Sequence, residues 1–107
     1  MTRWGLIVEE TTGSGEAARW TPRVLAVVDG GRGEALARLE RFARQYQPQH
    51  PMMPKQRWLF ETADGFLLFL EGRRSEYHCR FSAVELVCDS TGYERPSGPQ
   101  DAPPHRG

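Results

Sequence analysis

The residues that could do chemistry are few, and each also has a plain structural use. His50, His78, Cys79 and Cys88 are the soft metal ligands outside the C-terminal tail. Zinc sites favour closely spaced ligand pairs on one surface. His78 and Cys79 are adjacent, so on a strand their side chains point to opposite faces and cannot share one ion. We therefore predict no metal site and no cofactor, and a buried, unreactive thiol at Cys79.

Nucleophilic catalysis needs a Cys or Ser beside a His base that a third group orients. Nothing in the spacing of Cys79, His50 and Asp89 requires such an arrangement, and no serine lies in a nucleophile-elbow pattern. The neighbouring carboxylates of Glu9 and Glu10 fall on opposite faces of a strand, so they do not form an acid–base couple. The sequence therefore favours a protein that is not an enzyme.

A glycine-rich stretch precedes the one segment with a strong helical period. The backbone N–H groups and the dipole at a helix start can bind phosphate, so Gly31, Arg32 and Gly33 are candidate phosphate-binding residues. The stretch lacks the lysine and hydroxyl residue of a P-loop, and its spacing is not that of dinucleotide-binding loops. A strand-to-helix turn needs glycine in any case. We interpret these glycines first as a turn.

A proline-rich connector over residues 47–56 offers a different kind of candidate site. Its three prolines predict an extended stretch. Exposed methionines adapt to a partner's surface, and extended proline-rich segments are a recurring recognition mode. The candidate binding residues are His50, Met52, Met53, Lys55, Arg57 and Trp58. The alternative is a rigid link between helix and sheet whose methionines pack on the core.

The periodicity of apolar residues predicts an α+β fold of ββαβββ order, with a mainly antiparallel sheet and one major helix on one face. Residues 3–10 and 23–28 have the pattern of two strands that form a hairpin. A helix is predicted from Glu34 to Tyr46. Its apolar residues form one stripe: Ala35, Leu36, Leu39, Phe42, Ala43 and Tyr46.

A second hairpin is predicted around Asp64-Gly65, a pair that supplies the positive φ of a tight turn. In that register Phe60 lies opposite Phe69. A fifth strand covers residues 76–81, with Tyr77, Cys79 and Phe81 on the core side. Ser82 to Glu85 has the pattern of a capping box, which predicts a short helix from Ala83 to Cys88. Continuation of the strand is the alternative.

Composition indicates one small domain over residues 1–89 and a disordered Pro/Gly-rich tail over 90–107. The formal net charge is zero, so no global field attracts nucleic acid or anionic membrane. No apolar run has the length of a signal peptide or a membrane span. We expect a cytoplasmic protein with no membrane partner, where two cysteines make no disulfide framework.

The apolar run over residues 66–70 gives the strongest indication of function. It is apolar on both faces of its strand, whereas one helix covers one sheet face only in part. An exposed apolar patch of this size marks an interface. We therefore expect a protein-interaction or regulatory module that binds a protein partner or self-associates as a homodimer. The alternative is nucleic-acid or nucleotide-phosphate binding through the basic region from Arg32 to Arg57, beside aromatic strand residues.

Overall fold

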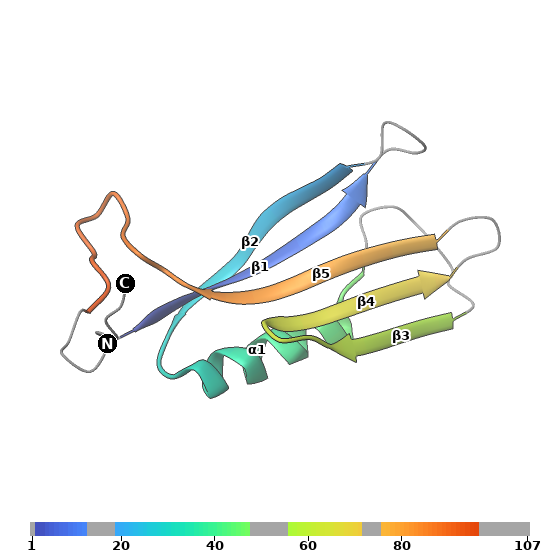
Figure 1. Cartoon of the computed structure of the whole chain (residues 1–107), viewed down its shortest axis with the longest axis horizontal. Helices are drawn as coiled ribbons and strands as arrows, with labels where there is room; N and C mark the ends of the chain where they lie inside the picture. The colour runs from blue at the N-terminus through green and yellow to red at the C-terminus, as the bar shows by residue number, and fades with distance from the viewer. Residues whose placement is uncertain (1, 13–18, 48–55, 72–75, 97–107) are drawn as a thin grey trace, which may run out of the picture.

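The computed structural model describes residues 2–12, 19–47, 56–71 and 76–96. Along the chain they form β1 (Arg3–Thr12), β2 (Arg19–Asp29), α1 (Arg32–Gln45), β3 (Gln56–Glu61), β4 (Gly65–Glu71) and β5 (Glu76–Glu85). The predicted α+β class and the ββαβββ order are confirmed. Figure 1 shows the strands side by side in one sheet with α1 beside it.

The sheet is antiparallel throughout, in the order β2-β1-β5-β4-β3. β5 is central and joins the β1–β2 hairpin to the β3–β4 hairpin. β1 and β2 turn away from β4 and β3 at one end, so the sheet is strongly twisted (Figure 1). Helix α1 packs against β1, β4 and β5. We call the side of the sheet that carries α1 the helix face and the opposite side the open face.

The core lies between α1 and the helix face, as the apolar periodicities predict. Leu6 and Val8 of β1, Leu68 of β4 and Phe81 of β5 are fully buried there against Leu39 of α1. Burial of each such side chain stabilises the fold by about 1.5–3 kcal/mol. The predicted helical stripe is confirmed, because all six of its members belong to this core or pack against it.

The turn between β3 and β4 differs from the prediction. The Thr62 N–H donates to the Gly65 carbonyl at 2.8 Å, so the central turn residues are Ala63 and Asp64. Gly65 opens β4 and has no positive φ. The register is therefore shifted by two residues, and Phe60 lies opposite Leu67 instead of Phe69. Each side chain keeps its predicted face, because a shift of two preserves the alternation.

Gly65 has a different reason to be glycine. A Cβ atom there would overlap the carbonyl oxygen of Phe81 on β5 and lie 2.9 Å from a methyl group of Leu39. The start of β4 thus approaches β5 more closely than any side chain allows. Asp64 thus lies in the turn, whereas this close backbone approach is what requires glycine at position 65.

The short helix predicted from Ala83 to Cys88 is wrong. β5 continues through Ala83 and Val84 to Glu85, where its residues pair with β1. The Leu86 N–H then donates to the Arg3 carbonyl at 2.8 Å. Pairing with a neighbouring strand satisfies these backbone groups, and it overrides the local capping pattern.

Hydrogen bonds continue into the first part of the stretch that the sequence assigned to a tail. Cys88 and Glu94 form an isolated β-bridge, and the Arg95 N–H donates to the Val87 carbonyl at 2.8 Å. The Asp89 carboxylate accepts bonds from the hydroxyl and N–H of Thr91, which lower the pKa of that carboxyl. Residues 97–107 of the predicted tail lie outside the described residues.

Candidate interaction surface

The open face carries a row of aromatic rings that runs across four strands. The rings of Trp20 (β2) and His78 (β5) lie 5.4 Å apart, and those of His78 and Phe69 (β4) are also 5.4 Å apart. Phe60 on β3 extends the row, edge-on to Phe69 at 5.8 Å. Trp58 lies directly opposite Phe69 in the β3–β4 pairing. Antiparallel pairing places directly opposed residues on one face, so the two hairpins contribute to a single aromatic surface.

The open face also holds most of the exposed apolar surface. Five of the six large apolar side chains that are exposed in the described residues lie on it: Val24 (59%), Val27 (52%), Phe60 (52%), Trp58 (43%) and Val84 (40%). The sixth, Val87, follows β5. Scattered exposed apolar residues need no explanation, but a group confined to one face indicates an interaction site. The expectation of an uncovered second face is met among the described residues.

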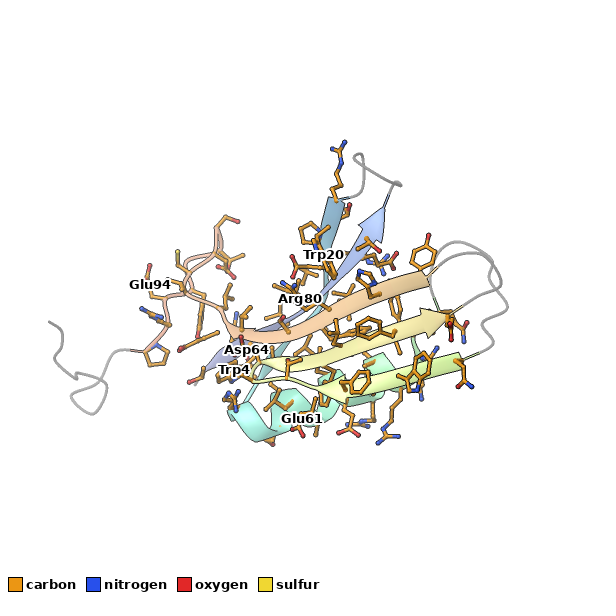
Figure 2. The ribbon with its side chains drawn as sticks, turned by 45° about the vertical axis from the view of Figure 1, so that its right-hand side comes forward. Trp4, Trp20, Glu61, Asp64, Arg80 and Glu94 are labelled. Atoms are coloured by element: carbon orange, nitrogen blue, oxygen red, sulfur yellow. The ribbon has the colours of Figure 1, made fainter. Side chains whose placement is uncertain are left out.

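In the described residues this face carries two ion pairs, Arg3 with Asp29 at one end of β1 and β2, and Arg80 with Glu9 near the centre. The guanidinium of Arg80 stacks on the Trp20 ring at 4.6 Å from its centroid, and its Nη1 is 3.8 Å from Oε1 of Glu9. Figure 2 shows Trp20 and Arg80 on one side of the sheet and Glu61 on the side of α1. Both side chains of the pair keep solvent access, at 51% for Arg80 and 28% for Glu9. The face thus offers one positive and one negative group near its centre.

A shallow hollow of about 280 Å³ lies beside Arg80, at the β3–β4 turn. Its walls include Thr62, Asp64, Leu67 and Ser82. The small side chain of Ser82 on β5 leaves room for the hollow. The open face therefore has a shallow depression next to the aromatic rings of β3 and β4.

The predicted connector site is only partly described. His50, Met52, Met53 and Lys55 lie outside the described residues. Trp58 is on the open face, as the alternation of β3 predicts. Arg57 is on the opposite face, where its Nη2 donates to the carbonyls of Ala43, Arg44 and Tyr46 at 2.9–3.1 Å. It binds the C-terminal end of α1, a structural role that the sequence did not indicate.

The candidate phosphate site at the start of α1 is occupied by the chain itself. The Gly31 N–H donates to Oε1 of Glu34 at 2.9 Å, so a carboxylate takes the position that an anion would use. Arg32 turns away and donates through Nη2 to the Ala63 carbonyl at 2.6 Å. Gly30 has φ 131 and makes the turn, while its carbonyl accepts a bond from Nε1 of Trp4 at 2.9 Å. These contacts favour the structural interpretation of the glycines.

A polar cluster lies on the helix face, beyond the end of α1. The Tyr46 hydroxyl donates to the buried carboxylate of Glu10 and accepts a bond of 2.6 Å from Nη2 of Arg23. Arg23 also approaches Glu10 at 3.9 Å. The hydroxyl and both charges are thus satisfied within the cluster. It joins the edge strand β2 to the end of the helix and offers no free catalytic group.

The two cysteine side chains differ in solvent exposure. Cys79 is buried, as predicted, and burial together with the nearby Glu10 raises its pKa to about 12. Cys88 is exposed. A pKa this high leaves very little thiolate, the nucleophilic form, at neutral pH. Within the described residues no three His, Cys, Asp or Glu side chains are placed to hold a metal ion.

Sequence reasoning placed His78 and Arg80 on the exposed side of their strand but did not identify the aromatic row. The row depends on which residues of β2, β4 and β5 lie side by side, and the register error in the second hairpin separated Trp58 from Phe69. No helix in the described part of the chain is long and apolar enough to cross a membrane. No protein-family model, curated protein or solved structure matches this chain.

Proposed function

We propose that this chain is a non-enzymatic protein-interaction module that associates with a second copy of itself. Its contact surface is centred on Trp58 and Phe60, the two exposed aromatic side chains of strand β3. The observation that carries the proposal is that five of the six exposed large apolar side chains of the described residues lie on the open face. Aromatic residues dominate the binding energy of most interfaces, so the β3 side of this face is its strongest part.

A second copy suits this surface electrostatically. The chain has a formal net charge of zero, so two copies approach without mutual repulsion. The open face itself carries the balanced pair of Arg80 and Glu9. A two-fold contact brings the same patch of both subunits together, and a patch of mixed sign is compatible with itself.

Nucleic-acid binding has less support from the geometry. Such a surface interleaves basic and aromatic side chains. Arg38 and Arg41 lie on α1, where they line a depression of about 200 Å³ with Phe42, on the helix side of the sheet. Arg57 is bonded to the helix end. The aromatic row is on the open face, where the basic residue that stacks on it, Arg80, is beside Glu9 and Arg3 is paired with Asp29.

The test compares two serine variants of the full chain by sedimentation velocity. Phe60→Ser removes an apolar side chain from the proposed contact, whereas Val87→Ser removes one of similar exposure away from the sheet. We expect Phe60→Ser to weaken self-association on the order of tenfold or more, as for an interface hot spot, and Val87→Ser to leave it unchanged. Equal association of both variants would overturn the proposed contact.

A further inference from the structure

The two edges of the sheet differ in how they are protected against strand pairing. The β2 edge contains Pro22, which has no N–H to donate, and a bulge near Leu25 that interrupts its register. Natural proteins use such features to block pairing with other chains. The β3 edge, with the sequence Gln-Arg-Trp-Leu-Phe-Glu, contains no proline, no lysine and no bulge. It is the edge at which another strand can add.

The hydrogen-bonding groups that β3 presents at this edge follow from its pairing with β4. The Thr62 N–H donates to Gly65, and partners alternate along an antiparallel pair. The N–H and C=O groups of Trp58 and Phe60 therefore point to β4. Those of Arg57, Leu59 and Glu61 point outward. β3 is the last strand of the sheet in the described part of the chain, so these groups face no strand there.

We propose that two copies of this chain join through their β3 strands, antiparallel, into one continuous sheet with Leu59 on the two-fold axis. This inference rests on the proposed self-association and specifies its geometry. In this register Leu59 pairs with Leu59 of the second copy and Arg57 with the second copy's Glu61. All three outward-facing residues of each copy are then used, which makes about six hydrogen bonds between the strands.

Side-chain chemistry selects this register over its neighbours. A shift by two residues in either direction leaves one outward-facing residue of each β3 without its partner and loses about two hydrogen bonds. The proposed register places opposite charges across the junction twice, Arg57 against Glu61. On the open face it sets Trp58 beside Phe60 of the second copy, so four aromatic rings meet at the junction. Both helices lie on the other side.

Amide hydrogen exchange of the full chain, followed by NMR, tests the pairing residue by residue. At a concentration where sedimentation shows a dimer, we expect slow exchange at the amides of Arg57, Leu59 and Glu61. On dilution to the monomer these three become fast, whereas Trp58 and Phe60 stay protected because their partners are in β4. A dimer in which those three amides exchange fast overturns the strand pairing but leaves the proposed function in place.

A charge variant gives a second, independent test. Glu61→Arg puts like charges across both Arg57 contacts, and we expect the dimer to weaken on the order of tenfold. Glu71→Arg makes the same charge change on exposed β4 surface and should leave the dissociation constant within about twofold of wild type. Circular dichroism confirms that both variants fold. Equal dissociation constants for the two variants would refute the register, and absence of any dimer in wild type would refute the proposed function as well.

Discussion

Replacement of Arg57 by methionine separates structural from binding roles at the start of β3. The sequence grouped this residue with Trp58 as part of one interaction surface, but the two side chains lie on opposite faces. Arg57 reaches three carbonyls at the end of α1 at 3.1, 2.9 and 3.0 Å. We expect Arg57→Met to lower the free energy of unfolding, because these bonds to the end of α1 are lost.

The magnitude follows from the contacts. Hydrogen bonds to a charged group contribute about 1.5–3 kcal/mol each. The three bonds share one nitrogen and the Arg57 side chain is exposed, so their effects do not add in full. Methionine keeps part of the apolar stem against the sheet. We expect a loss of about 2 kcal/mol, which corresponds to a decrease in Tm of roughly 10 °C for a domain of this size.

Urea denaturation monitored by tryptophan fluorescence measures this change. The matched control is Arg38→Met, which removes the same charge from an exposed position on α1. Its unfolding free energy should stay within about 0.5 kcal/mol of wild type. If Arg57→Met unfolds at the wild-type midpoint, the bonds from Arg57 to the end of α1 do not stabilise the fold and the structural interpretation is refuted.

Two further substitutions and one labelling experiment test other parts of the fold. Gly65→Ala should cost several kcal/mol or prevent folding, since its methyl group would overlap a backbone carbonyl of β5; a stable variant in a thermal melt would contradict the close approach. Native protein at pH 8 should show one reactive thiol, Cys88, because a pKa raised from 9.0 to about 12 lowers the thiolate fraction of Cys79 about a thousandfold. Rapid labelling of two thiols with Ellman's reagent would refute the burial of Cys79. Tyr46→Phe should destabilise the protein by about 1–3 kcal/mol in urea, because Glu10 loses a buried donor; an unchanged midpoint would mean that the cluster contributes nothing.

Local periodicity was sufficient to predict the elements and their inner faces. The stripe of α1 and the alternation of β1 each bury a contiguous set of apolar side chains, and no competing arrangement does this as well. The same alternation placed Cys79 in the core and His78 outside it. Such assignments need only the chain's own order, because a period of 2 or 3.6 fixes a face without reference to neighbours.

The errors arose where a residue's role depends on a distant strand. Gly65 resembles a turn residue in the sequence, and only the proximity of Phe81 on β5 explains it. Ser82 resembles a helix cap, yet its neighbours complete the pairing of β5 with β1. Arg57 looks like surface charge until the end of α1 is placed beneath it. In each case a long-range contact outweighs a local preference of about 1 kcal/mol.

For the candidate interaction surface, too, local periodicity predicted one part and long-range strand pairing determined the rest. The sequence predicted that one helix would leave the second sheet face uncovered, and five of the six exposed large apolar side chains of the described residues lie there. The row of Trp20, His78 and Phe69 required the registers of three strand pairs. The difference between the two sheet edges likewise depends on strand order, which no local pattern contains.

The proposed function requires that the unmodified chain self-associates. Sedimentation velocity should be recorded from micromolar to near-millimolar concentration at moderate salt. We expect a reversible shift from monomer to dimer within this range, since a contact of a few hydrogen bonds and four aromatic rings has moderate affinity. A monomer at every concentration would contradict it.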